Sequence, residues 1–130
     1  MIKGRKIGHL GLATNHIEKN LAWYIDVLGF EQIASFVTPK GEPVYFLQGN
    51  GFIYEMYQPQ PAVPKEQEGK IDHFAFDSAD IEEDYKECVT AGYHITTNGI
   101  EEILTFWERG IRYFKIASPT GEEFEFCQIM

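Results

Sequence analysis

Apolar and polar positions along the first half of the chain follow two different periods in turn. Residues 6–14 alternate as expected for a half-buried strand, with Leu10 and Leu12 on the face opposite His9. Residues 15–29 instead carry apolar side chains at the spacing of an amphipathic helix. Three strand-like segments follow, near 30–37, 43–49 and 52–58. The first half therefore predicts the order strand, helix, strand, strand, strand.

Local signals mark where these elements begin and end. Asn15, with Glu18 three residues later, predicts a capped helix start, and Gly29 predicts the helix end. Turns are predicted at Pro39-Lys40-Gly41 and at Gly49-Asn50-Gly51, because glycine, proline and asparagine favour the backbone conformations of tight turns.

The same order of elements restarts in the second half. Residues 59–69 hold three prolines and almost no apolar periodicity, so they are predicted to be a linker. The elements predicted after it are a strand at 70–77, a helix at about 80–91, a short strand at 93–96, and strands near 111–117 and 123–129, the last two joined by the turn Ser118-Pro119-Thr120-Gly121. Residues 97–110 carry little signal, and a long loop in a compact domain is usually functional or mobile.

Sequence identities between the halves indicate a duplicated module. Lys6-Ile7-Gly8-His9 recurs as Lys70-Ile71-Asp72-His73 at an offset of 70 − 6 = 64, Tyr45-Phe46 recurs as Tyr113-Phe114 at an offset of 68, and Glu55 and Gln58 recur as Glu125 and Gln128 at an offset of 70. The order is kept throughout. We therefore predict an α+β fold in one domain, residues 1–130, with βαβββ modules at about 5–58 and 70–130.

Composition narrows the classes of partner. The 130 residues are 44% hydrophobic and 24% charged, and the formal net charge of −9 argues against nucleic-acid binding, which needs a basic face. No apolar run is long enough for a membrane span, and no signal peptide is evident. Cys88 and Cys127 do not suggest a disulfide framework. We expect a cytoplasmic protein with a small-molecule substrate.

Four residues at matching places in the two modules form a candidate metal site. His9 and His73 lie in the first strand of each module, and Glu55 and Glu125 lie between apolar neighbours in the last strand. A carboxylate in such a position is costly to desolvate unless a partner compensates it. Two imidazoles and two carboxylates suit one divalent ion such as Ni²⁺, Zn²⁺, Co²⁺, Fe²⁺ or Mn²⁺, and leave coordination positions open for substrate.

These motifs together resemble the vicinal oxygen chelate superfamily, which includes glyoxalase I, bleomycin-resistance and fosfomycin-resistance proteins and extradiol dioxygenases. The resemblance covers nearly the whole chain. In the first module it rests on residues 7–12, Trp23-Tyr24 and Leu28-Gly29-Phe30. In the second module it rests on residues 71–76 and on the turn at 118–121 followed by Glu125-Phe126. Ser118 and Thr120 depart from the usual turn aspartates. The family implies a curved mixed sheet and, commonly, a homodimer, with the metal site formed within one chain or shared between two.

The ligand order His, Glu, His, Glu resembles glyoxalase I in particular. It implies a metal-dependent lyase or isomerase that moves a proton next to a carbonyl of a 2-oxo or hemithioacetal substrate, with Glu55 and Glu125 as the catalytic bases and a thiol as cosubstrate. Ala13 stands where glyoxalase I carries its glutathione-anchoring Arg. Arg109, Arg112 and Lys115 are alternative anion anchors, and also fit exposed strand and loop cations.

Two other readings of the same fold remain open. One is a thiol transferase that acts on an epoxide antibiotic, and the other is a metal-free protein that binds an antibiotic. Metal-free members usually lack the ligand quartet, and the fosfomycin and dioxygenase branches typically have no carboxylate where Glu55 stands. Tyr57 and Cys127 share a strand face with the two carboxylates and are expected to line the site. Cys127 fits a small wall residue.

Overall fold

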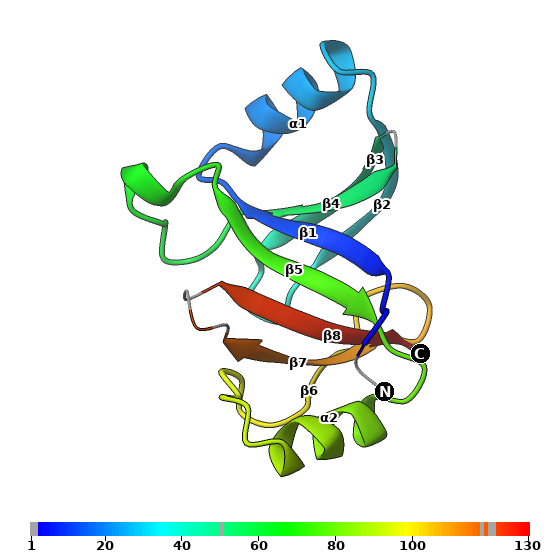
Figure 1. Ribbon diagram of the computed structural model, residues 1–130. Coiled ribbons are helices and arrows are strands. Elements are labelled where there is room, and N and C mark those ends of the chain that lie inside the picture. Colours follow the sequence, from blue (N-terminus) through cyan, green and yellow to red (C-terminus); the bar gives the residue numbers. More distant parts are fainter. Residues whose placement is uncertain (1–2, 50, 118, 120–121) are drawn as a thin grey trace. The chain divides into compact units, whose positions relative to one another are not determined.

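The computed structural model describes residues 3–49, 51–117, 119 and 122–130, and it has the predicted α+β class and order of elements (Figure 1). The elements are β1 (Ile7–Ala13), α1 (Ile17–Asp26), β2 (Glu31–Val37), β3 (Pro43–Gly49), β4 (Phe52–Tyr57), β5 (Ile71–Asp77), α2 (Ile81–Thr90), β6 (Glu101–Ile103), β7 (Ile111–Ala117) and β8 (Glu123–Ile129). The predicted linker contains one short 3₁₀ turn, Lys65–Gln67. None of the described helices is long and apolar enough to cross a membrane.

The chain divides into two compact units, His9–Asp72 and His73–Met130, and residues 3–8 belong to the second unit. In the first unit, β1 pairs in parallel with β4, which continues through antiparallel pairs to β3 and β2. In the second unit, β5 pairs in parallel with β8, which continues to β7 and β6. Each unit therefore repeats one βαβββ topology, as the sequence identities predict.

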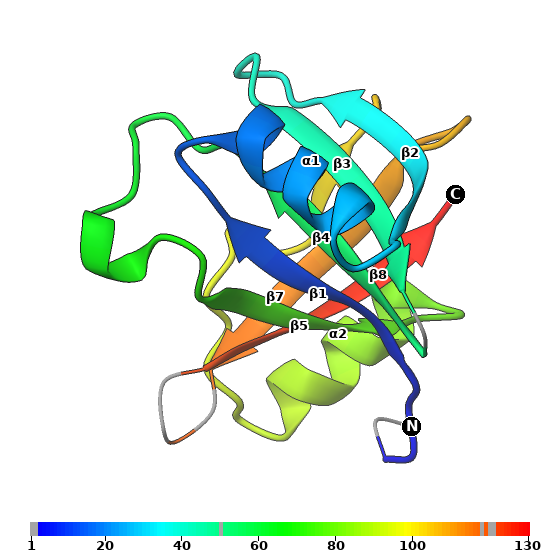
Figure 2. The same ribbon diagram turned by 90° about the horizontal axis from the view of Figure 1, so that it is seen from above.

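One helix covers one face of the strands in each unit. In the first unit α1 packs against β4 (Figure 2), and the core consists of Leu12, Ile17, Leu21, Leu47 and Met56. In the second unit α2 packs against β7 and β8, and the core consists of Ile81, Cys88, Phe114 and Phe126. Phe76 packs against this second core, whereas Phe74 stacks on Phe124. Burial by these helices leaves the other face of the strands for the candidate site.

Equivalent glutamine side chains cap the starts of both helices. The N–H of Ile17 donates to Oε1 of Gln58 at 3.1 Å, and the N–H of Ile81 donates to Oε1 of Gln128 at 2.9 Å. The first N–H groups of a helix have no partner within the helix, so these side chains satisfy donors that would otherwise stay unpaired. Each glutamine comes from the end of its module's last strand and joins that strand to its helix.

The predicted cap by Asn15 is wrong. Its side-chain amide exchanges two hydrogen bonds with the backbone of Val63 in the linker, at 2.9 and 3.0 Å. The helix instead begins after His16, whose side chain makes no capping bond. Glu18 accepts a hydrogen bond from the Tyr45 hydroxyl at 3.0 Å and does not complete a capping box. A tertiary contact has therefore replaced the local one.

The predicted strand at 93–96 is also corrected. That segment forms one isolated bridge to β7, and the short strand β6 lies in the following stretch. Between the two pieces, Thr97 accepts the backbone N–H of Lys115 at 3.1 Å through its hydroxyl oxygen and donates to the Gly99 carbonyl at 2.9 Å. Gly99 has a positive φ of 64° that suits glycine. This side-chain bonding interrupts the strand.

The predicted turns fall partly inside the described residues. Gly41 has a φ of 81°, and its N–H donates to the Thr38 carbonyl at 2.9 Å, which confirms the turn at Pro39-Lys40-Gly41. Gly29, at a φ of 72°, follows the end of α1 as predicted. Asn50 of one predicted turn lies outside the described residues, as do residues 118, 120 and 121 of the other.

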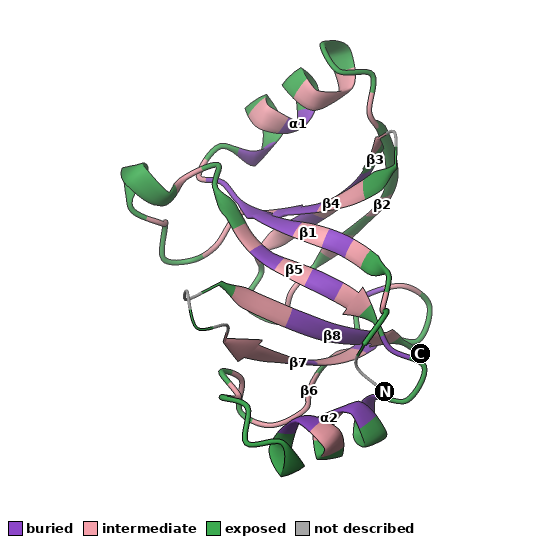
Figure 3. Ribbon diagram, in the orientation of Figure 1, coloured by how far each residue is buried: buried purple, intermediate pink, exposed green. Residues whose placement is uncertain are grey.

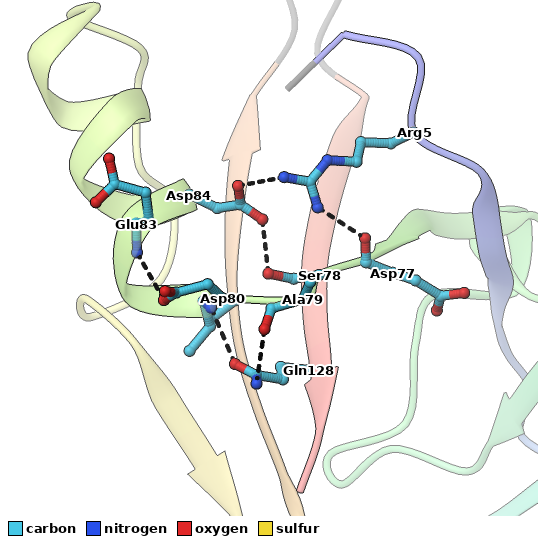
Figure 4. A network of polar contacts seen from close by, with 9 residues as sticks. Arg5, Asp77, Ser78, Ala79, Asp80, Glu83, Asp84 and Gln128 are labelled. Carbon is cyan, nitrogen blue, oxygen red and sulfur yellow. Dashed lines mark hydrogen bonds and ion pairs between the residues drawn. The ribbon is translucent and has the colours of Figure 1, made fainter. Parts of the chain in front are cut away.

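Residues 3–8 are held to the second unit by a buried carboxylate (Figure 4). The Arg5 guanidinium pairs with Oδ1 of Asp84 and donates to the Asp77 carbonyl at 3.1 Å. The other oxygen of Asp84 accepts the Ser78 hydroxyl at 2.6 Å, and Asp84 is only 2% exposed. A buried carboxylate is tolerated when it is paired and hydrogen-bonded, as here.

The first unit has a neutral version of this arrangement. Thr14 and Asn20 occupy the positions that match Ser78 and Asp84 at the offset of 64, and the Asn20 amide donates to the Thr14 hydroxyl oxygen. The duplicated module has therefore kept a polar contact between strand end and helix. Only the second copy has a charge that binds the start of the chain.

Candidate metal centre

In the first unit, strand pairing brings His9 and Glu55 together. Gly11 of β1 is in register with Glu55 of β4, and His9, two residues earlier, lies on the same face as Gly11. His9 Nε2 lies 3.5 Å from Glu55 Oε2. Both side chains are buried, opposite the face that packs Leu12 and Met56 under α1.

The second unit repeats this arrangement. Ala75 of β5 is in register with Glu125 of β8, and His73 lies two residues before Ala75. His73 Nε2 lies 3.5 Å from Glu125 Oε2, the same separation as in the first unit. Both residues are buried, and the buried middle of β8 is drawn in purple in Figure 3. The four residues predicted as ligands thus form two equivalent His–Glu pairs.

The separation within each pair fits two ligands of one ion. Nitrogen and oxygen ligands lie about 2.0–2.2 Å from Zn²⁺, so two neighbouring ligands are about 3.0–3.5 Å apart, depending on the angle at the ion. The 3.5 Å distances agree with this range. Each imidazole presents Nε2, a nitrogen that can bind metal when the ring is neutral.

The strand face beside each pair differs between the units. Phe46 of β3 stands directly opposite Glu55, is buried, and packs edge-on to the His9 ring at 5.6 Å between centroids. Lys115 of β7 stands directly opposite Glu125. Glu55 therefore has an aromatic neighbour across the ladder, and Glu125 has a cationic one.

This register corrects one part of the sequence repeat. Because Phe46 pairs with Glu55 and Lys115 pairs with Glu125, Phe46 and Lys115 are structurally equivalent, at an offset of 115 − 46 = 69. The identity of Tyr45-Phe46 with Tyr113-Phe114 is therefore shifted by one residue. A shift of one residue moves a side chain to the other face of a strand, so these tyrosines have different surroundings.

The three candidate anion anchors have different surroundings in the structure. The Arg112 side chain bonds to Glu82 of α2, on the helix-covered face of β7. Arg109 is exposed in the loop before β7. Lys115 lies on the face of Glu125, and only this cation remains a candidate. Ala13, at the position of the expected glutathione anchor, is buried.

Two further side chains follow the carboxylates on their strands. Cys127 is buried, is not in a disulfide, and lies opposite Tyr113 in the ladder. Tyr57 lies opposite Val44. Burial, followed by the nearby Asp72 carboxylate, raises the pKa of Tyr57 far above its ordinary value, so its phenol stays protonated at neutral pH. Both residues share a face with their carboxylates, as predicted.

Comparison with known proteins identifies the family of this chain. A model of the glyoxalase/bleomycin resistance protein/dioxygenase superfamily matches residues 6–126. The chain belongs to this superfamily. Its relative YwbC of Bacillus subtilis (strain 168), an uncharacterized protein, is 30% identical over 129 residues, which cover 95% of this chain and 98% of YwbC.

Solved structures share the superfamily fold. Hypothetical protein BH1468 from Bacillus halodurans C-125 superposes with a TM-score of 0.79 at 23% identity, over 98% of this chain and 96% of that protein. Methylmalonyl-CoA epimerase from Mycobacterium tuberculosis superposes with a TM-score of 0.80 at 17% identity, over 100% of this chain and 93% of the epimerase. At these identities the likeness concerns the fold.

Proposed function

We propose that His9, Glu55, His73 and Glu125 bind one divalent metal ion, and that the protein is a metal-dependent isomerase or lyase of the glyoxalase I type. The observation that carries this proposal is the repeated His–Glu pair, buried and separated by 3.5 Å in both units. Imidazole and carboxylate together favour Ni²⁺, Zn²⁺, Co²⁺, Fe²⁺ or Mn²⁺ over the harder ions Ca²⁺ and Mg²⁺.

The reaction is proton transfer at the carbon next to a carbonyl. When bound, the ion supplies Lewis-acid polarisation of substrate oxygen. One carboxylate, Glu55 or Glu125, takes the α-proton and returns it to the adjacent carbon, as a general base and then a general acid. Their buried surroundings exclude water, which strengthens electrostatic interactions with the reacting groups.

The repeat itself supports this chemistry. Loss of a proton next to a carbonyl makes that carbon planar, and a base on either face of the plane can then exchange a proton with it. Two carboxylates contributed by two equivalent modules provide such a pair of bases. The epimerase named among the structural relatives is an isomerase, which is consistent with this class of reaction.

Charge favours a small substrate over a coenzyme A thioester. Coenzyme A carries several phosphate charges, and a chain with a net charge of −9 repels polyanions at long range. We therefore propose a compact 2-oxo compound or a hemithioacetal, formed with a thiol cosubstrate, as the substrate. The buried Ala13 in place of an anchoring Arg argues for a thiol other than glutathione.

The test compares the four histidines of the chain. His9→Ala and His73→Ala each remove one proposed ligand, whereas His16→Ala and His94→Ala remove exposed imidazoles as matched controls. We expect purified, metal-loaded protein to lose about 10-fold or more of its Zn²⁺ or Ni²⁺ affinity only in the first two variants. Circular dichroism verifies that all four variants fold.

Turnover then distinguishes the candidate functions. The hemithioacetals of methylglyoxal with several thiols are the substrates of choice, assayed with and without metal. Failure of the intact protein to bind any of the five metals would reject the metalloenzyme and favour the metal-free antibiotic-binding protein. Metal-dependent addition of a thiol to an epoxide, without isomerase activity, would favour the thiol transferase.

A further inference from the structure

Lys115 is a cation on the strand face of a proposed metal ligand. In the β7–β8 ladder it stands directly opposite Glu125, and residues directly opposite each other on one face have Cβ atoms about 4.5–5.5 Å apart. Arg112, three residues earlier, points to the other face and bonds to Glu82. Lys115 lies on the same strand face as Glu125 and is half-buried, so part of it is accessible to a ligand.

The backbone holds Lys115 in place on both sides. Its N–H donates to the Thr97 hydroxyl oxygen at 3.1 Å, and its carbonyl accepts the N–H of Thr96 at 2.9 Å. The ladder with β8 fixes its other edge. A side chain that starts from such a rigid backbone can be directed at a small ligand with little loss of entropy.

The carboxylates around Lys115 have other partners. Glu125 lies beside His73, and the Glu123 carboxylate accepts the Thr96 hydroxyl at 2.6 Å. In the part of the chain that the structure describes, Lys115 makes no ion pair with either of them. A half-buried ammonium group that is not used within the protein is available to an anion from outside.

The duplicated module shows that the fold does not need a cation here. The structurally equivalent residue of the first unit is Phe46, which is buried against His9. One copy of the same ladder thus folds with an aromatic side chain and the other with a lysine. Packing of the strands therefore does not require the charge of Lys115.

We propose that Lys115 binds an anionic group of the substrate, and that the substrate is a small 2-hydroxy- or 2-oxocarbonyl compound that carries a carboxylate. The proposal rests on the proposed function, because it places that carboxylate next to the carbonyl on which the metal and Glu125 act. The lysine ammonium is a compact charge with three donors, which suits a single carboxylate. Lys115 then determines specificity, while the bases perform the proton transfer.

The experiment uses two compounds that differ in this one group. Hydroxyacetone and 3-hydroxypyruvate share one α-hydroxyketone group, which carries a methyl group in the first compound and a carboxylate in the second. Their dissociation constants are measured by calorimetry on protein loaded with Co²⁺ or Zn²⁺, for the wild type, Lys115→Met, Lys115→Arg and Lys86→Met. Lys86 is an exposed lysine of α2, so its variant controls for the change in net charge.

We expect the wild type and Lys86→Met to prefer 3-hydroxypyruvate. Lys115→Met should reduce the ratio of the two affinities by about 10- to 100-fold, the effect of losing one hydrogen bond between charged groups. Lys115→Arg should keep most of the preference, because the charge remains. Metal content is measured in each variant, and equal content assigns the change to the anion.

Three results would overturn the inference, and the third also rejects the proposed function. If Lys115→Met retains the full preference, or if the wild type has none, the anion is not bound by Lys115 and the proposed function stands. If the metal-loaded wild type binds neither compound, the carbonyl chemistry of the proposed function is rejected, and the assignment of Lys115 is rejected with it.

Discussion

At the scale of single residues, the two proposed bases are equal in sequence position and unequal in surroundings. Glu55 faces Phe46 across its ladder and Glu125 faces Lys115. A positive charge stabilises a carboxylate, and an aromatic neighbour does not. An asymmetric substrate likewise meets the two bases differently. The internal repeat therefore provides the pair of carboxylates, and their neighbours make the two roles distinct.

Glutamine at either position tests these roles. Glu55→Gln and Glu125→Gln each keep an oxygen that can coordinate metal and lose the group that accepts a proton. We expect metal binding to persist in part, and turnover to fall by about 10²–10⁴-fold, the usual contribution of a general base. Exchange of the substrate α-hydrogen with solvent deuterium, followed by NMR, measures the first proton transfer directly.

The variant with the slower exchange identifies the residue that takes the first proton. Gln128→Ala, a change within β8 that leaves both carboxylates in place, serves as a control for loss of local stability. Wild-type exchange in both glutamine variants would show that Glu55 and Glu125 are ligands only, and the proton-transfer mechanism would be wrong.

Cys88 gives a prediction on pH. The side chain lies on the buried face of α2, within the core of the second unit, and burial raises the pKa of its thiol from 9.0 to about 11. The unfolded chain therefore loses this proton at a lower pH than the folded chain. The resulting stability is fully present below pH 9 and is lost as the pH rises towards 11, by roughly 2–3 kcal/mol in all.

Urea unfolding at pH 8 and pH 10 measures this loss. The free energy of unfolding should fall more steeply with pH in the wild type than in Cys88→Ala, which lacks the titrating group. Iodoacetamide should leave Cys88 unmodified in the folded protein at pH 8. Equal pH slopes for the two proteins would show that the buried thiol does not contribute.

At the scale of elements, the joint between last strand and helix is the most closely repeated feature. Gln58 and Gln128 each accept the first N–H of a helix, and Gln128 also donates to the Ala79 carbonyl at 3.1 Å. Helix α2 has a second cap, since the Asp80 carboxylate accepts the Glu83 N–H at 3.1 Å. Among the side chains described by the structure, Gln58 caps α1 without such help from His16.

Removing these caps should weaken both units. We expect Gln58→Ala and Gln128→Ala to lower the free energy of unfolding by about 1 kcal/mol each, the usual effect of losing a helix cap. Gln60→Ala, an exposed neighbour in the linker, should change it by less than about 0.5 kcal/mol. Chemical denaturation measures all three, and equal effects at Gln58 and Gln60 would contradict the capping role.

The sequence predicts the elements better than the contacts between them. Strand and helix periods follow from which faces are buried, so the order of the elements, and the shared positions of His9 with His73 and of Glu55 with Glu125, could be inferred from alternation and repetition. The side chain of Asn15 could not, because its partner Val63 is 48 residues away. The register of Lys115 against Glu125 also depends on strand pairing. The identity of Tyr45-Phe46 with Tyr113-Phe114 suggested an alignment that is shifted by one residue from the structural one.

The prediction of a strand at 93–96, where the structure instead has β6 further along at Glu101–Ile103, was wrong for a related reason. Residues 93–96 carry the apolar pattern of a strand, but the hydroxyl of Thr97 bonds to β7 in place of the backbone. Local composition does not show which hydrogen-bonding partner a threonine will find. Gln58 and Gln128 were visible as a repeated pair, and their capping role required the positions of both helices.

At the scale of the whole molecule, each unit contributes half of the proposed ligand set. A homodimer, and the choice between a site within one chain and a site shared by two, remain predictions from the superfamily. The boundary between the units does not follow the order of the sequence, because residues 3–8 belong with His73–Met130. Arg5 and Asp84 connect these two segments across 79 positions.

Breaking this connection should cost more than removing it cleanly. Arg5→Met leaves Asp84 buried without its cation, and we expect a loss of about 2–3 kcal/mol, less than for a fully buried pair because Arg5 is partly exposed. Adding Asp84→Asn should restore most of that loss, because Asn20 already fills the equivalent place in the first unit. Thermal and urea unfolding measure this double-mutant cycle.

The outcome that contradicts this account is a double variant that is no more stable than Arg5→Met. If Arg5→Met and Arg5→Met/Asp84→Asn are equally unstable, the buried carboxylate does not depend on Arg5, and the Ser78 hydroxyl is a sufficient partner. Asn20→Asp, which introduces a buried charge in the first unit without an arginine, should destabilise the protein as a converse control.

Residues 3–8 belong to the unit that contains His73–Met130, and this affects the order in which the two units can fold during synthesis. Residues 9–72 form a contiguous unit that can fold while the ribosome is still adding the second half. The segment around Arg5 is synthesised before the unit 9–72, yet its partners Asp77 and Asp84 are made more than 70 residues later. The segment around Arg5 therefore lacks its partners until Asp77 and Asp84 have been made, and a bulky insertion immediately before Arg5 should affect the unit that contains His73–Met130 rather than the unit 9–72.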